Sequence, residues 1–146
     1  MAAYSFLNIA CNFAGPGIAL NLASGAAAAE EGITLEPSTD KNVMTIGADG
    51  KGMHSLVADD SVKMTVRLLK TSPVNAALMT AYNAQSLSSA IWGINTVTLS
   101  DTARGDFTVI QQVAFRKRPV LTYAKEGGMM EWEFDGIQAN SVLGAS

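Results

Sequence analysis

The chain has 146 residues, a formal net charge of −3, 48% hydrophobic residues, 16% charged residues, one cysteine and one histidine. This length suits one domain spanning residues 1–146, and a single cysteine excludes an intramolecular disulfide. One cysteine and one histidine also cannot supply the three or four ligands of a usual zinc site. Because an isolated domain carries roughly a quarter charged residues, the low charge predicts a β domain rich in small residues or a surface covered by other subunits.

The first residues, MAAYSFLNIACNF, lack a basic segment, and polar residues interrupt the apolar ones. Nowhere does the chain run to about 18 consecutive apolar residues. We therefore expect neither a signal peptide nor a transmembrane span. The sequence predicts a soluble protein of a reducing cytoplasm.

The first half of the chain is predicted to form short strands separated by turns. Residues 4–13 alternate weakly and end at Gly15-Pro16-Gly17, a strong turn signal, after which a second strand begins at Ile18. Residues 24–31 show no apolar periodicity and fit a loop or a helical turn. Two further strands are expected at residues 33–37 and 43–46, and the glycine-rich residues 47–52 form a flexible turn.

The stretch 62–69 is the clearest strand, because apolar and mostly polar side chains alternate along it. One helix follows, over about residues 73–90, with Ser72 as its N-cap and Pro73 at the first helical position. Gly93 is the expected stop. The predicted apolar stripe consists of Val74, Ala77, Leu78, Ala81 and Tyr82, and the polar side, expected to face outward, includes Asn75, Asn83 and Ser86.

Three more strands are predicted after the helix. The first contains Val97 and Leu99, and a turn at residues 101–106 follows it. The second is longer, and its apolar residues Phe107, Val109, Val113 and Phe115 share one parity with Gln111. The third follows Gly127-Gly128 and alternates Trp132 and Phe134 with three carboxylates, Glu131, Glu133 and Asp135.

Some eight or nine strands with one helix and no internal repeat predict a mainly β protein. The expected architecture is an antiparallel β-sandwich or barrel with one flanking α-helix, rather than βαβ units.

The residues that could carry catalysis are few. Cys11 shares its parity with Ile9 and Phe13, which indicates a buried structural cysteine. His54 follows a glycine-rich turn and fits a surface or interface position. The turn at 47–52 is not a phosphate-binding loop, because Gly52 precedes Met53-His54 instead of Lys-Ser/Thr. No serine lies in a G-x-S-x-G elbow. We therefore expect no enzyme, no cofactor and no metal site.

Charge is unevenly distributed along the chain. Residues 1–60 carry seven acidic and two basic residues, whereas residues 61–146 carry six acidic and eight basic ones. The densest segments are the acidic run 30–40 and the basic triplet Arg116-Lys117-Arg118. They are either solvated loops or two complementary faces that meet between copies of the chain.

An ordered set of segments resembles the tail tube proteins of contractile-tailed bacteriophages, in particular a family of small phage structural proteins. The segments are YSFLNI, GPG, EEGITLE, DKNVMTIGADGKGMHSL, VRLLKTSPVNAALMTAYNAQ and YAKEGGMMEWEF, at positions 4–9, 15–17, 30–36, 40–56, 66–85 and 123–134. The resemblance implies a tail-tube-like β-sandwich or barrel whose hexameric rings stack into a tube inside a contractile sheath. It also implies that the tube holds the tape-measure protein and then conducts DNA without binding it specifically.

The resemblance implies localisation in the virion tail after assembly in the host cytoplasm. The implied partners are further copies, the tail sheath protein, the baseplate hub or tube initiator and the tape-measure protein, with no membrane. Candidate lumen-facing residues are Glu131, Glu133 and Asp135. Candidate inter-ring or inter-subunit residues are Asp40, Lys41, Asp49, Lys51, His54, Arg116, Lys117 and Arg118.

Other functions stay open at this stage. One is a tube initiator or terminator, or another tail or baseplate component with the same fold. A small β-barrel that binds a ligand is a second, and a hydrolase with an unrecognised site is a third.

Overall fold

The computed structural model describes residues 4, 9–16, 18–22 and 32–144. Nine strands and one helix lie in these ranges; the segment 24–31, predicted as a loop or helical turn, falls outside them. The elements are β1 (Ile9–Gly15), β2 (Ile18–Asn21), β3 (Ile33–Pro37), β4 (Asn42–Ile46), β5 (Gly52–Leu56), β6 (Val62–Leu69), α1 (Pro73–Gln85), β7 (Asn95–Asp101), β8 (Asp106–Lys117) and β9 (Met129–Val142).

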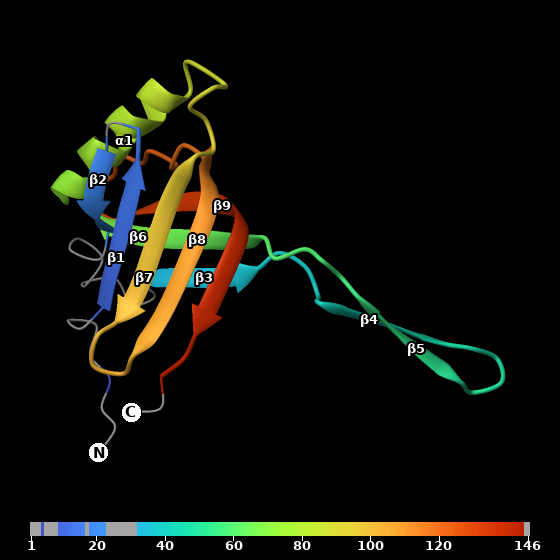
Figure 1. Cartoon of the computed structure of the whole chain (residues 1–146). Coiled ribbons are helices and arrows are strands. Elements are labelled where there is room, and N and C mark those ends of the chain that lie inside the picture. The colour runs from blue at the N-terminus through green and yellow to red at the C-terminus, as the bar shows by residue number, and fades with distance from the viewer. Residues whose placement is uncertain (1–3, 5–8, 17, 23–31, 145–146) are drawn as a thin grey trace.

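Seven strands form one antiparallel sheet in the order β2-β1-β7-β8-β9-β6-β3. The sheet curls, so that β6 and β3 cross behind β1, β7 and β8 (Figure 1). The long strand β9 joins the two halves, because its residues 129–136 pair with β6 and its residues 133–142 pair with β8. The predicted mainly β, sandwich-like architecture is confirmed. The sheet does not close into a barrel, since β2 and β3 remain as edges.

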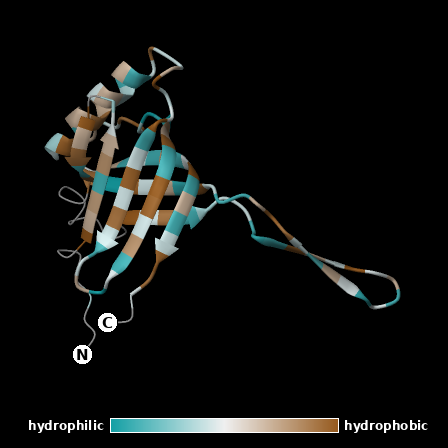
Figure 2. Ribbon diagram, in the orientation of Figure 1, coloured by the Kyte–Doolittle hydropathy of each residue, from teal (hydrophilic) through white to brown (hydrophobic). Residues whose placement is uncertain are grey.

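The core fills the space between the two halves of the curled sheet, and α1 lies beside β2 at one end of the body (Figure 1). Brown and teal alternate along the strands in Figure 2, as expected when one face of each strand is buried. Phe115 lies at the centre of an aromatic cluster: its ring centroid is 5.0 Å from that of Phe134, 5.6 Å from Tyr82 and 5.7 Å from Phe13.

The predicted parity of β8 is wrong at its first half. Thr108 and Ile110 are buried there, while Phe107 is 46% exposed. A bulge at Gln112, which has a φ of 55°, changes the side that faces the core, so that Val113 and Phe115 are buried after it. A sequence pattern of period two cannot show such an extra residue.

The helix begins as predicted but ends earlier. Ser72 Oγ accepts a hydrogen bond from the Val74 N–H (3.3 Å), and Pro73 is the first helical residue. The last helical residue is Gln85, with Ser86 as the C-cap, so the predicted end near residue 90 is wrong. Gly93, with a φ of 80°, lies in the turns before β7 and does not stop the helix.

The stripe of α1 also differs from the prediction in two places. Leu78 and Ala81 are buried, but Ala77 is exposed. Asn75, predicted to face outward, is buried instead: its Nδ2 donates to the Leu69 carbonyl (2.7 Å) and its Oδ1 accepts from Trp132 Nε1 (3.0 Å). The polar side chain is therefore placed inward by two strand partners that the helix sequence alone does not reveal.

Candidate assembly surfaces

A hairpin of β4 and β5 extends far from the body of the molecule (Figure 1). We call residues 38–61 the arm. Five residue pairs hold its strands in register, from Asn42 opposite Leu56 to Ile46 opposite Gly52. Gly50, at a φ of 85°, makes the turn at its tip, where a residue with a Cβ would be strained. The segment after β4 therefore serves as a turn, as predicted, and β5 already begins at Gly52.

Hydrogen bonds tie the base of the arm together. The Ser38 N–H donates to the Ser61 carbonyl (3.0 Å), and Lys41 Nζ forms an ion pair with Asp60 (2.7 Å). Asp59 accepts from the Ser61 N–H (2.8 Å) and the Thr39 hydroxyl (3.0 Å). These hydrogen bonds, those from Ser61 above all, hold the pKa of the Asp59 carboxyl below its ordinary value.

The arm exposes apolar side chains on both of its faces. The register places Met44, Ile46 and Leu56 on one face, and Val43 and Met53 on the other. All five are exposed; Leu56 is 84% and Met44 60% exposed. A two-stranded hairpin is marginally stable in water by itself, and exposed apolar patches mark interaction sites. The arm is therefore a candidate surface for contact with another molecule.

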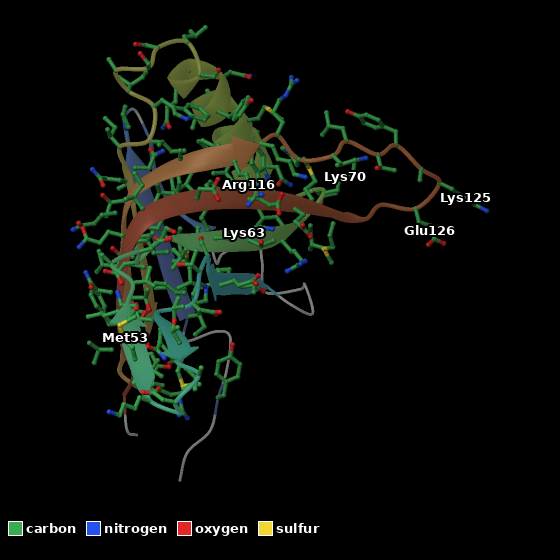
Figure 3. The ribbon with its side chains drawn as sticks, turned by 90° about the vertical axis from the view of Figure 1, so that its right-hand side faces the viewer. Met53, Lys63, Lys70, Arg116, Lys125 and Glu126 are labelled. Carbon is green, nitrogen blue, oxygen red and sulfur yellow. The ribbon has the colours of Figure 1, made fainter. Side chains whose placement is uncertain are left out.

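A second surface is a ladder of ion pairs across β6, β9 and β8. Glu131 of β9 pairs with Arg67 of β6 (3.2 Å), and Asp135 pairs with Arg116 of β8 (3.6 Å). Between them, Glu133 contacts both neighbouring strands: Lys63 lies 2.8 Å away and Lys117 3.3 Å away. Lys63 and Arg116 lie on this face in Figure 3.

Glu133 is the most enclosed of the three carboxylates, with 10% of its side chain exposed. The hydrogen bond from Lys63 lowers its pKa below the ordinary 4.5, and Lys117 acts in the same direction, against the opposing effect of desolvation. Each predicted lumen-facing carboxylate thus has a cationic partner in the same molecule. Seven charged side chains make up this ladder, four of them basic, so the face carries paired charges rather than a bare acidic strip.

A groove lies between α1 and the segment that follows β8. It has a volume of about 890 Å³. Met79, Tyr82 and Asn83 line it from the helix, and the lining from the other side is Arg116, Lys117, Arg118, Pro119 and Leu121. We call it the α1–β8 groove. Its walls combine apolar surface with a dense cluster of positive charge.

The structure separates the predicted contact residues into two groups. Asp40, Lys41, Asp49, Lys51 and His54 all lie on the arm, where Asn42 Nδ2 and His54 Nδ1 are 3.1 Å apart. The triplet Arg116–Arg118 lies on the body, in the ladder and the groove. Sequence reasoning missed the apolar residues of the arm, although their pairing across a glycine turn was a readable hairpin signal. It also missed the exposed Val120, Leu121 and Tyr123.

Cys11 and the metal-ligating residue types were the candidates for chemistry in the sequence. Burial raises the pKa of the Cys11 thiol to about 12, which leaves it without nucleophilic thiolate. Across the described ranges, no three His, Cys, Asp or Glu side chains gather to hold a metal ion. Nor does any described helix have both the length and the apolar character of a membrane span.

Comparison with known proteins shows the fold through a solved structure and the family through a sequence model. A chain of the PVC sheath–tube complex, an extracellular contractile injection system solved by cryo-EM in the extended state, aligns with a TM-score of 0.54 at 8% identity, over 93% of this chain and 88% of that chain. At this identity the likeness concerns the fold alone. No curated protein matches the sequence. The family model described as bacteriophage PhiTE tail tube protein matches residues 1–144, and the chain therefore belongs to this family of phage tail tube proteins.

Proposed function

We propose that this chain is a structural virion protein whose copies form stacked hexameric rings, the inner tube of a contractile tail. The observation that carries the proposal is the arm, in a chain of a tail tube family: it projects from the body and exposes apolar side chains on both faces. A projecting segment of this kind forms a heterologous contact, in which one surface of a subunit meets a different surface of the next. Such contacts generate rings and open-ended stacks.

The arm reaches the next ring in this proposal. Its charged residues, among them Asp40, Lys41, Asp49, Lys51 and His54, then lie at the contact between rings, together with Arg116, Lys117 and Arg118 of the body. The open edges β2 and β3 are available for pairing between neighbours in one ring, which would remove the exposed edges of the sheet.

The ion-pair ladder faces the channel in this proposal. Paired charges suit a conduit, because Lys and Arg side chains already engaged by Glu131, Glu133 and Asp135 compete poorly for phosphates. DNA then passes without specific binding, since each phosphate contact would add affinity through counterion release.

The outer surface meets the sheath protein, as the sheath–tube assembly of the structural neighbour suggests. The exposed side of α1 is the proposed outward surface, with Ser86 toward the sheath and Asn83 toward a neighbouring copy. The tape-measure protein occupies the channel before DNA does, and the baseplate hub or tube initiator starts the stack. The protein is assembled in the host cytoplasm, acts in the virion and has no enzymatic role.

Negative-stain electron microscopy of the purified protein tests the proposal. We expect tubes or stacked rings of indefinite length with six-fold symmetry. Single rings that never stack would favour the alternative, a tube initiator, a terminator or another tail or baseplate component of the same fold. Monomers at high concentration would overturn both.

The placement of the ladder has its own test. The isosteric changes Glu131→Gln and Asp135→Asn should leave tubes intact if the face lines the channel, because no neighbour then needs those charges. Loss of ring formation in variants with the wild-type melting temperature would place the ladder at an interface between subunits.

A further inference from the structure

We infer that the arm of one copy docks in the α1–β8 groove of the next copy. This contact rests on the proposed self-assembly and specifies which two surfaces of the subunit meet. The occupant of the groove is thus a second copy of this chain, and its contacting part is the hairpin of β4 and β5.

The two surfaces match in their apolar content. The arm is two strands wide and presents Met44 and Leu56 on one face and Met53 on the other. The groove has two walls, with Met79 and Tyr82 on the helix side and Leu121 opposite. A hairpin lying in the groove would place one face against each wall, and so cover the apolar side chains that the free subunit leaves in water.

The two surfaces also match in charge. Residues 38–61 contain four acidic and two basic residues, and Lys41 is already paired with Asp60. Asp49 lies at the exposed tip. The groove offers three cations in succession. Arg116 and Lys117 are partly neutralised by the ladder, whereas exposed Arg118 forms no ion pair with any residue in the described part of the chain. Complementary charge of this kind favours the correct docking partner and register.

An arm cannot fill the groove of its own subunit. In Figure 1 the arm leaves the body on the right, while α1 lies at the upper left. The contact must therefore join two copies, and the second copy keeps a free arm of its own. A heterologous contact that leaves both surfaces available at the ends repeats without limit, as a tube requires.

A mixing experiment with two defective variants tests the contact. The arm variant is Met44→Ser with Met53→Ser, and the groove variant is Asn83→Asp with Arg118→Glu, which brings negative charge to the acidic arm. Each variant alone should have a critical concentration for assembly at least 10-fold above that of the wild type. At concentrations where the wild type forms tubes, electron microscopy should therefore show no stacked rings of either variant. The matched control is Lys125→Glu, a reversal at the tip of a loop that projects away from the ladder in Figure 3; it should assemble like the wild type.

The mixture gives the sharper result. The groove variant still has an intact arm and the arm variant an intact groove, so an equimolar mixture should form one-to-one mixed contacts that do not propagate. Native mass spectrometry with one variant isotopically labelled detects these mixed species. The inference would be overturned if the groove variant formed tubes, or if two folded variants gave no mixed species. In either case, tubes formed by the wild type would still support the proposed function. A wild type that never assembles would overturn both.

All four substituted positions are exposed, so we expect both variants to keep the wild-type melting temperature. Should the double groove variant unfold, the single change Arg118→Glu repeats the test, because its side chain has no ion-pair partner among the described residues.

Discussion

Gln85 and Asn95 exchange two hydrogen bonds through their side-chain amides, 2.9 Å and 2.8 Å long, where neither side chain is exposed. Asn95 Nδ2 also donates to the Val113 carbonyl (3.0 Å). The pair fixes the last residue of α1 to the first residue of β7. Gly15 permits it, because a Cβ at that position would lie 1.7 Å from Asn95 Oδ1.

Replacing Asn95 by Ala should destabilise the subunit by about 1–3 kcal/mol, because it leaves the buried amide of Gln85 without its partner. Urea unfolding of the unassembled subunit measures the loss. The matched control is Asn83→Ala on the exposed side of the same helix, where we expect a change within about 0.5 kcal/mol. Equal effects of the two changes would contradict a structural role for the pair.

This pair also explains where prediction from sequence succeeded and failed. The strand at 62–69 and the start of α1 depend on local alternation and on the Ser72-Pro73 cap, and both were predicted. The end of α1 depends on a contact with β7, and the inward position of Asn75 depends on Trp132. Such partners come from distant segments, so helical periodicity cannot indicate them.

The candidate assembly surfaces show the same contrast between features set by local sequence and features set by distant partners. The three carboxylates of β9 were recognisable as one face, because they alternate along a strand. Their cationic partners were not, because the ladder depends on the register of β9 with β6 and β8. The first strand of the arm and its turn were predicted, whereas its second strand, β5, and the exposed apolar side chains were not. The hairpin stands away from the body because β4 and β5 pair only with each other and take no place in the seven-stranded sheet. Local sequence patterns do not reveal this pairing.

Glu133 should make stability depend on pH. Its pKa is lowered in the folded protein, so the stabilisation is full above the unfolded value near 4.5 and is lost as the pH falls through the folded value. Glu133→Gln should therefore cost about 1 kcal/mol at neutral pH. The free energies of unfolding of variant and wild type should converge below the folded pKa, as urea titrations at several pH values would reveal. A difference that stayed constant down to acid pH would assign the effect to packing instead of charge.

Gly136 is required by close packing at the crossing of β6, β9 and β8. A Cβ there would lie 2.3 Å from Ile110 Cγ2, and it would also contact Val113 and Val62 at 3.5 Å each. Gly136→Ala should cost about 1–3 kcal/mol through overpacking.

A double-mutant cycle with Ile110→Ala checks the cause. Because the second change removes the clashing methyl, the added Cβ should cost less in its presence than in the wild type. Strict additivity of the two free-energy changes would mean that Gly136→Ala acts through something other than this contact.

Cys11 should be unreactive in the folded subunit. The thiol is fully buried in the hydrophobic core, and its raised pKa leaves a negligible thiolate fraction near neutral pH. A chromogenic thiol reagent should label it only at the rate of unfolding, and labelling should become complete in urea. Rapid stoichiometric labelling without denaturant would show that β1 opens in the native subunit.

The two faces of the arm should both contribute to assembly. The change Met44→Ser with Leu56→Ser alters one face, and Val43→Ser with Met53→Ser alters the other. Burying a Met or Leu side chain is worth about 1.5–3 kcal/mol, and each 1.4 kcal/mol changes an affinity about tenfold. Each pair should therefore raise the critical concentration for tube formation at least about tenfold, measured by sedimentation. The melting temperature of the subunit should stay unchanged, because β4 and β5 pack extensively only on each other among the described elements. The exposed Leu87, in the turns after α1, supplies the control: Leu87→Ser removes similar apolar area off the arm and should assemble normally. An effect confined to one pair would mean that the arm lies flat on a single surface instead of between two walls.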